Sequence, residues 1–342
     1  MSTQLLFGFI DLPLLFALII AMGISLYIIL DGFDLGVGIL FLWDRKPHEQ
    51  DQMMASVAPF WDGNETWLVL GGGAFYGVFP KAAYIIFPAL YIPIMLMLFA
   101  LIFRGVAFEF RFKSETSRPL WNWSFCLGSS LAAFAQGTML GAFIQGFTVQ
   151  DGAFAGGYMD WLTPFTVFTG LALMAGYSLL GATWLMMKAE GSLQEKAFAV
   201  GKPLMLVLGA CIGTVSLWTP LMDAHIADRW FAVPGFFALL PVPMITISLG
   251  ILLWRSITHK NEVKPFLLTI SLFLMSYLGL GLSMWPYVVP RSMTFWDASS
   301  PYDSQLFILV GVALLLPVIL AYTAYTFYVF RGKSNTHEHY GS

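Results

Sequence analysis

Two short acidic motifs interrupt apolar stretches of the sequence and hold the residues best suited to chemistry. The first reads DGFD at 31–34, and the second reads WDGNE at 61–65. Each motif carries two carboxylates spaced i, i+3, which places both on one face of a helix. Burial and neighbouring carboxylates favour the protonated form of such groups, so they can exchange protons near neutral pH. The residue types and spacing therefore point to proton handling by Asp31, Asp34, Asp62 and Glu65.

The same four acids have a second interpretation as a structural network. In that case they cap helices or form ion pairs with Arg104 or Arg111. Glycines accompany the first motif in DGFDLGVG at 31–38, and glycine permits close helix contact in membranes. We expect at least one acid to conduct protons, with Asp62 as the leading candidate, and we expect the first motif to be partly structural.

Composition places these motifs in a membrane protein. The 342 residues are 58% hydrophobic and only 11% charged, and the mean hydropathy is +0.74. A soluble domain carries about 25% charged residues, so this chain could not cover a water-exposed surface. We predict an all-α polytopic membrane protein with a single integral-membrane domain over 1–342. The net charge of -3 gives no indication of nucleic-acid binding.

The number of membrane spans follows from the length of the apolar runs. About 20 residues are needed to cross roughly 30 Å of hydrocarbon. By this criterion we expect nine transmembrane helices, at about 12–42, 58–80, 82–103, 122–145, 164–187, 203–221, 235–254, 265–288 and 306–330. Proline is tolerated at a helix start, and Pro203 and Pro265 are predicted there. Pro93 and Pro317 lie inside spans, where we expect kinks.

Basic residues are distributed unevenly among the predicted loops. Fourteen of the 17 lysines and arginines lie in alternate connections or in the C-terminal tail. Short loops rich in lysine and arginine face the cytoplasm. The N-terminus is therefore predicted outside and the C-terminus in the cytoplasm, which agrees with an odd number of spans. In this orientation all four acids of the two motifs gather near the cytoplasmic side.

Histidine does not occur in any predicted span. A membrane haem with two imidazole ligands therefore cannot be built from this chain alone. Trp61 and Trp67 flank the acids of the second motif, and two interpretations stay open for them. They could line the edge of a quinone or of a haem held by a neighbouring subunit, or they could simply pack the helix interior.

Five sequence elements together resemble subunit II of the cytochrome bd ubiquinol oxidases, a family that includes the cyanide-insensitive type. They are DGFDLGVG at 31–38, WDGNETWL at 61–68, the segment from Phe103 to Arg111, WPYVVP at 285–290 and TFWDASS at 294–300. The elements run from the first span to the last loop, so the resemblance covers essentially the whole chain. Each element alone is weak, whereas the combination is specific.

The resemblance implies a subunit of a terminal oxidase in the respiratory chain of a bacterial inner membrane. Such an oxidase oxidises quinol, reduces dioxygen to water and takes the protons for that chemistry from the cytoplasm. Two b-type haems and one d-type haem are expected in subunit I, and no cofactor is expected to bind this chain alone. The implied partners are subunit I in a heterodimer, small single-span accessory subunits, lipids, and ubiquinone, because some members bind a quinone within subunit II. The implied fold is nine helices in two four-helix bundles plus one peripheral helix.

The resemblance also assigns roles to single residues. Asp62 matches the acid position of a proton pathway toward the haems of the partner, and Asp34 matches the second acid of the first motif. Asp31 and Glu65 complete the expected pathway. The positions expected within the family motifs or facing the partner are Trp61, Asn64, Trp67, Arg104, Trp296 and Asp297.

Two other functions stay open from the sequence. A proton-coupled secondary transporter would use the acids to couple substrate movement to protons, with a polar site on interrupted helices near mid-membrane. A purely structural assembly subunit would tolerate neutralisation of every acid. The oxidase subunit is the function that the combined motifs favour.

Overall fold

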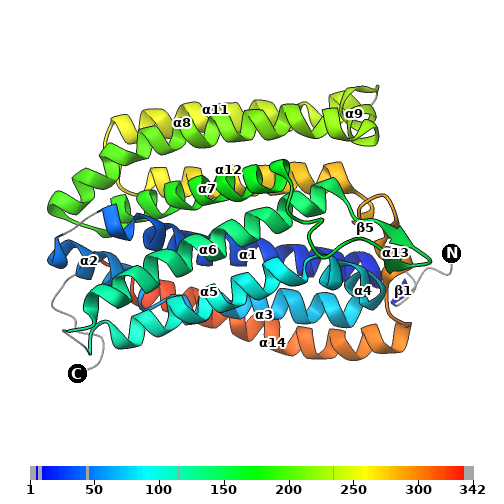
Figure 1. Ribbon diagram of the computed structural model, residues 1–342, viewed down its shortest axis with the longest axis horizontal. Coiled ribbons are helices and arrows are strands. Elements are labelled where there is room, and N and C mark those ends of the chain that lie inside the picture. The colour runs from blue at the N-terminus through cyan, green and yellow to red at the C-terminus, as the bar shows by residue number, and fades with distance from the viewer. Residues whose placement is uncertain (1–4, 7–9, 44–45, 114–115, 234, 335–342) are drawn as a thin grey trace.

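The computed structural model describes residues 5–6, 10–43, 46–113, 116–233 and 235–334. Long helices run roughly alongside one another along the longest axis of the molecule, joined by short connections at its two ends (Figure 1). The all-α polytopic class predicted from composition is confirmed. Arg45, counted among the basic loop residues, and Pro234, which precedes the seventh predicted span, lie outside the described residues.

The long elements are all helical, and strands occur only in short ribbons. The long helices are α1 (Leu12–Leu40), α3 (Trp61–Val78), α5 (Tyr91–Phe110), α6 (Arg118–Gln145), α7 (Pro164–Lys188), α8 (Gly191–Met222), α11 (Pro241–Thr258), α12 (Lys264–Met284) and α14 (Tyr302–Val329). The shorter helices are η1 (Phe41–Trp43), α2 (Pro47–Val57), α4 (Pro80–Ala89), α9 (Ala224–Phe231), α10 (Gly235–Leu239) and α13 (Phe295–Ala298). Antiparallel ribbons pair β1 (Leu5–Leu6) with β2 (Ile10–Asp11), β3 (Val149–Gln150) with β4 (Ala153–Phe154), and β5 (Tyr287–Val289) with β6 (Met293–Thr294).

Eight spans among the described helices are long and apolar enough to cross a membrane, with η1 counted with α1 and α10 with α11. The helix α3 is not one of them, because its 18 residues include the polar second motif and several glycines. At 1.5 Å per residue it is about 27 Å long, close to the thickness of the hydrocarbon layer. It packs against α1 and α14. The predicted count of nine spans therefore depends on α3 and stays a prediction.

Two predicted span boundaries are wrong, and proline is involved in both. The third predicted span, 82–103, is divided at Leu90 into α4 and α5, and Pro93 lies in the first turn after the break. Proline has no N–H and cannot continue the hydrogen bonds of the preceding turn. The sixth predicted span starts at Pro203, but α8 begins about three turns earlier and carries this proline inside. Packing of these first turns against α7 outweighs the single lost hydrogen bond.

The central helix is α1, which packs against α3, α6 and α7. It crosses α7 where both helices need glycine. A Cβ on Gly36 would lie 1.8 Å from the backbone oxygen of Tyr177, and a Cβ on Gly181 would lie 2.4 Å from the backbone of Gly36. Small residues allow membrane helices to approach to backbone contact. This crossing fixes the first motif against α7, as its glycines indicate.

The connections rich in basic residues share one end of the molecule, which we call the basic end. Ion pairs join segments there that are distant in the sequence: Arg111–Asp51, Arg118–Asp51, Lys196–Glu49, Lys260–Glu195 and Lys333–Glu262. The basic connections, which alternate with poorly charged ones along the sequence, thus lie together in space. The assignment of the basic end to the cytoplasm stays a prediction.

The outermost helices pack mainly against one neighbouring helix each. In Figure 1, α8 and α11 form a layer along the top of the molecule, and α14 lies along the bottom. The contacts of α8 are mainly with α7 and those of α11 mainly with α12, while Gln305 is the one buried residue of α14. The remaining faces of these helices are apolar and exposed along their length, so they must be covered by lipid or by another protein. The division into two four-helix bundles and a peripheral helix stays a prediction.

Candidate functional site

The acids of both motifs meet at Arg104, which α5 places inside the helix bundle. Its side chain is fully buried. Arg104 Nη1 lies 2.6 Å from Asp31 Oδ1 and 3.6 Å from Glu65 Oε1. Arg104 Nη2 lies 3.8 Å from Asp34 Oδ2. Three helices, α1, α3 and α5, therefore contribute charged side chains to one group, which we call the Arg104 cluster.

Asn64 joins α3 to α1 beside this cluster. Its amide nitrogen donates to Asp34 Oδ2 at 2.7 Å and to the carbonyl oxygen of Leu30 at 3.0 Å. The side chain is buried in the interior. Asp34 therefore accepts its hydrogen bond from a neutral amide, whereas Asp31 accepts one from the Arg104 guanidinium.

The charges of the Arg104 cluster do not balance, because three carboxyl groups surround one cation. Ionisation of all three would leave two negative charges without a counter-charge, at about 3 kcal/mol each in a membrane interior. Asp31 Oδ2 and Asp34 Oδ1 are buried and accept no hydrogen bond from a described residue. The cluster is therefore suited to holding protons, which would neutralise the excess carboxylates.

Glu65 is the outermost member of the Arg104 cluster. Its side chain is 27% exposed, whereas those of Arg104, Asp31 and Asp34 are fully buried. It lies one turn after Asp62 on α3. Glu65 is thus the member through which the cluster reaches the surface of the chain.

Asp62 does not join the Arg104 cluster, so three of the four acids of the two motifs lie around Arg104. Asp62 is exposed on the outward face of α3. The buried residues of this helix include Asn64 and Trp67, and Asp62 lies about 200° around the helix from Asn64. The spacing of Asp62 and Glu65 places them on neighbouring faces, and the position of α1 decides which one turns inward.

Three of the residues expected within the family motifs or facing the partner are interior residues. Arg104 and Trp67 are fully buried, and Asn64 is 2% exposed. They are therefore motif residues of the helix interior and do not themselves form a surface of this chain. Trp61 is half-buried and stacks on Phe108, with ring centres 5.0 Å apart and planes inclined by 7°.

Trp296 and Asp297 lie at the end of the molecule opposite the basic end, in and around α13 (Figure 1). Trp296 donates its indole N–H to Asp11 Oδ2 at 2.8 Å. The exposed Asp297 accepts a hydrogen bond from Thr294 Oγ1 at 2.5 Å and caps α13. These two residues of the TFWDASS element organise a connection and do not contact the Arg104 cluster.

A buried polar chain beside the cluster was not predicted from the sequence. Tyr177 donates its hydroxyl proton to Gln136 Oε1 at 2.8 Å, and Gln136 Nε2 donates to the Tyr27 hydroxyl at 2.8 Å. Tyr27 precedes Asp31 by one turn of α1. The ring of Tyr177 occupies space left by Gly32, where a Cβ would lie 2.7 Å from it. A tyrosine one turn before the acid and a glutamine inside a span are the signals that could have indicated these residues.

The described membrane spans carry no histidine that could hold a haem. Among the described histidines, His48, His225 and His259 are exposed in α2, α9 and the residue that ends α11. His337 and His339 lie outside the described residues. The described part of the chain also contains no group of three histidine, cysteine or acidic side chains able to hold a metal ion. A membrane haem with two imidazole ligands therefore cannot be built from the described spans of this chain.

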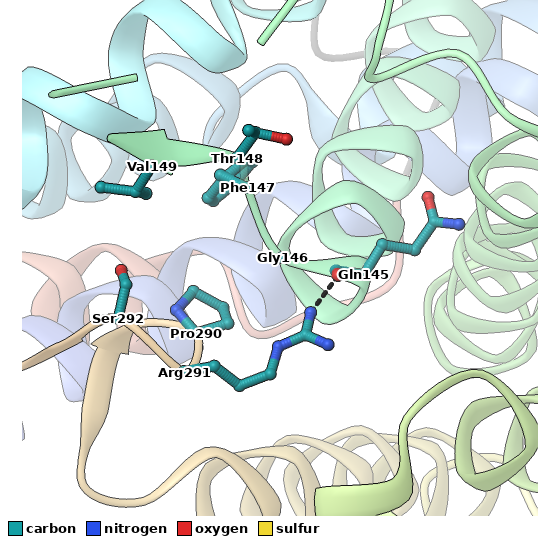
Figure 2. Close-up of a pocket in the computed structure, with 8 residues that line it drawn as sticks. All are labelled: Gln145, Gly146, Phe147, Thr148, Val149, Pro290, Arg291 and Ser292. Carbon is teal, nitrogen blue, oxygen red and sulfur yellow. Dashed lines mark hydrogen bonds between the residues drawn. The ribbon is translucent and has the colours of Figure 1, made fainter. Parts of the chain in front are cut away.

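An open cleft of about 370 Å³ lies at the end opposite the basic end, between the β3–β4 and β5–β6 connections. Arg291 crosses it and donates a hydrogen bond to the carbonyl oxygen of Gln145 (Figure 2). The same guanidinium lies 3.0 Å from Asp223 Oδ2. Arg291 thus ties three connections together. Both terminal nitrogens of its guanidinium already bind groups of this chain.

Comparison with known proteins gives a consistent set of similarities. The sequence matches the family described as cytochrome bd terminal oxidase subunit II over residues 12–330. It is 28% identical over 370 residues to cytochrome bd-I ubiquinol oxidase subunit 2 of Escherichia coli strain K12, covering 92% of this chain and 94% of that protein. It is 26% identical over 318 residues to cytochrome bd ubiquinol oxidase subunit 2 of Bacillus subtilis strain 168, covering 90% and 92%.

A solved structure is similar in fold. A chain of the bd oxidase from Geobacillus thermodenitrificans matches with a TM-score of 0.74 and 19% sequence identity, covering 94% of this chain and 99% of that chain. At this identity the likeness concerns the fold alone. The family match and the fold match extend over nearly the same part of the chain.

Proposed function

The chain belongs to the family of cytochrome bd terminal oxidase subunit II, and from this premise we propose that it carries protons from the cytoplasmic side toward the oxygen-reducing site of its complex. Its relatives are subunits of ubiquinol oxidases, so it is a multi-pass subunit of a haem-containing oxidoreductase in a bacterial inner membrane, in complex with subunit I. Family membership favours this function over a proton-coupled transporter.

The observation that carries the proposal is the Arg104 cluster. One cation for three carboxyls gives a group that can gain or lose a proton without creating an isolated charge in the membrane. Glu65 is its partly exposed member, and Asp62 lies one turn away on the outer surface. The proposed route therefore includes Asp62, Glu65, Asp31 and Asp34.

The proposed direction of proton entry follows from the basic end. Arg104 lies two turns, about 10 Å, before Arg111, which belongs to the ion pairs of that end. Loops rich in lysine and arginine face the cytoplasm. We therefore place the basic end and the C-terminus in the cytoplasm and the N-terminus outside, so that the cluster takes its protons from the cytoplasm.

The outward face of α3 is the proposed contact with subunit I. Its exposed residues recur at helical spacing and include a carboxylate, a hydroxyl and a glycine: Asp62, Thr66, Val69, Gly73 and Tyr76. Lipid chains cannot solvate a carboxylate, and small residues favour close helix contact. Asp62 would then lie at the boundary between the two subunits, where a proton passes from one chain to the other.

The haems, two of b type and one of d type, are proposed to belong to subunit I, because the family resemblance implies it and the described spans of this chain carry no histidine. Ubiquinol is the proposed reductant, as the names of the relatives suggest. A quinone bound within this subunit and small single-span accessory subunits are further expectations of the family resemblance. None of the steps assigned to Asp62, Glu65 or Arg104 depends on them.

The test is Asp62→Asn in the assembled complex. Asparagine keeps the size of the side chain but cannot carry a proton, so oxygen uptake with quinol should fall by about tenfold or more. The haem absorbance of the purified complex should be unchanged. The matched control is Glu109→Gln, which removes another exposed acid near the basic end.

The outcomes separate a proton-carrying role of Asp62 from a structural role and from a general effect of surface charge. Oxygen uptake equal to that of the wild type would remove Asp62 from the pathway. Loss of haem from the complex would assign Asp62 a structural role instead. Equal slowing in Glu109→Gln would point to a general effect of surface charge.

A further inference from the structure

A groove of about 350 Å³ runs between two helices on the side of the molecule away from α3 and α14 (Figure 1). It is formed by one side chain of α8 and several of α11: Met205, Ile247, Gly250, Ile251, Trp254 and Arg255. Its walls are apolar except at Arg255. An apolar groove with one charged end matches a lipid molecule, which has apolar chains and a charged headgroup.

Two cations lie at the charged end of this groove. Lys202 Nζ lies 5.2 Å from the centre of the Trp254 ring, and Arg255 is exposed next to this tryptophan. Among the described residues, neither Lys202 nor Arg255 lies in an ion pair. Other cations of the basic end, such as Lys260, have acidic partners. The groove therefore has an uncompensated charge of about +2 at its mouth.

The depth of these cations matches the headgroup region of a bilayer. The Lys260–Glu195 pair fixes the end of α11 beside the second turn of α8, and Lys202 follows two turns deeper. The 20 residues of α8 after Lys202 reach about 30 Å, the thickness of the hydrocarbon layer. Met205 and Gly250 lie farther along their helices toward the membrane centre. Trp254 stands at the level where tryptophan is enriched at the membrane interface.

We propose that this groove binds one acidic phospholipid. Lys202 and Arg255 bind its phosphate and its net negative charge, and one acyl chain lies along Met205, Gly250 and Ile251. Basic pockets between transmembrane helices on the cytoplasmic side suit anionic headgroups. Gly250 keeps the groove open, because a Cβ there would meet only the end of Met205, at 4.0 Å.

The combination of charge and groove distinguishes this ligand from simpler ones. Free inorganic phosphate would use the two cations but not the apolar walls. A zwitterionic phospholipid would fill the walls but would bring its cationic ammonium group close to Lys202 and Arg255. An acidic phospholipid satisfies both parts of the site.

The experiment counts lipid molecules retained by the intact, purified complex. Phosphatidylglycerol or phosphatidylcholine is added in detergent, and bound lipid is measured by native mass spectrometry. In the wild type we expect one tightly held phosphatidylglycerol that disappears in Gly250→Leu, because the leucine side chain fills the groove. Lys202→Gln and Arg255→Gln should each weaken retention about fivefold. Lys113→Gln, at another exposed lysine of the basic end, should change nothing.

The alternatives give different results. Equal retention of phosphatidylcholine, or unchanged retention in both charge variants, would overturn the proposal. Loss of phosphatidylglycerol in the charge variants but not in Gly250→Leu would show that the cations hold the headgroup without the groove, which would overturn the proposed path of the acyl chain. Haem content and melting temperature show whether each variant has assembled, and oxygen uptake is not the readout, so this result is independent of the proton pathway.

Discussion

The molecule contains two clusters of charged side chains with opposite composition and different surroundings. The Arg104 cluster holds three carboxyls around one cation inside the helix bundle. At the basic end, two arginines surround one acid: Arg111 Nη1 lies 2.7 Å from Asp51 Oδ1, and Arg118 also pairs with Asp51. The Asp51 side chain is 31% exposed. Water reaches Asp51 and Arg118, whose side chains are 31% and 32% exposed, whereas Arg104, Asp31 and Asp34 are fully buried.

This difference shows why the Arg104 cluster is a functional candidate, whereas the ion pairs of Asp51 serve to join helices. Near the surface an ion pair contributes about 0–1 kcal/mol and tolerates imbalance. In the interior, the free energy needed to remove two charges from water can exceed the free energy gained from their attraction. A buried ion pair is therefore weak evidence that the pair stabilises the fold. Three acids around one cation in that environment support the proposed proton-carrying role. Asp51, in contrast, ties α2 to α5 and α6.

Arg104→Leu should have the largest effect, because it leaves the buried acids without their cation. The expected loss is about 3–5 kcal/mol of the free energy of unfolding, with a lower yield of assembled complex. Chemical unfolding in mixed micelles measures the first, and haem absorbance per membrane protein measures the second. Arg104→Lys keeps the charge and should be milder. An unfolding midpoint equal to the wild type would show that the acids are neutral without Arg104.

Gln136→Leu should have the second largest effect, since it removes the partner of two buried tyrosine hydroxyls. Leaving buried polar groups unsatisfied costs about 1–3 kcal/mol. The same unfolding measurement tests this, with Thr214→Val as control, because the Thr214 hydroxyl bonds only the carbonyl oxygen of Ala210 in its own helix. If both variants unfold at the wild-type midpoint, the Tyr27–Gln136–Tyr177 chain contributes nothing to stability.

The sequence contains enough information for one part of the Arg104 cluster. Carboxylates in apolar runs need partners, and Arg104 is one of two arginines named as candidates; the pairing with Asp31 is confirmed. The helix periods place Asp31 and Asp34 on one face, which α1 presents to α3 and α5. These expectations follow from local spacing and from the cost of charge in lipid.

The contacts between distant helices could not be predicted from a single sequence. Gln136 is more than a hundred residues from Tyr27, and no local pattern states that α6 passes beside α1. The orientation of Asp62 depends on which side of α3 is covered by α1. The break at Leu90 depends on a balance between proline and packing in α4 and α5. Each of these features is a property of tertiary packing.

The pH dependence of stability should distinguish the Asp51 cluster from the buried one. Partial burial raises the pKa of Asp51, but its hydrogen bonds with Arg118 and Arg111 outweigh this and hold the pKa below the usual value. A lowered pKa in the folded state means that the stabilisation is complete above the unfolded value, about 3.9, and is lost as the pH falls through the folded value. Because the side chain of its partner Arg111 is fully buried, Asp51→Asn should cost about 1 kcal/mol at pH 7, and this cost should fall toward zero at strongly acid pH.

Unfolding of the wild type and of Asp51→Asn at a series of pH values provides the measurement. The difference between the two proteins should shrink on acidification. A difference that stays constant to the lowest pH would mean that Asp51 acts by packing rather than through its charge.

Glu195→Gln should have the smallest effect and sets the lower limit of the comparison. Glu195 and Lys260 pair at 2.6 Å, but their side chains are 60% and 59% exposed. Water solvates both charges almost as well when they are apart, so the unfolding midpoint should not change measurably. If Glu195→Gln lowered the free energy of unfolding as much as Asp51→Asn, solvent exposure would not explain the order of these effects. The number of charged partners around each acid would then have to explain it.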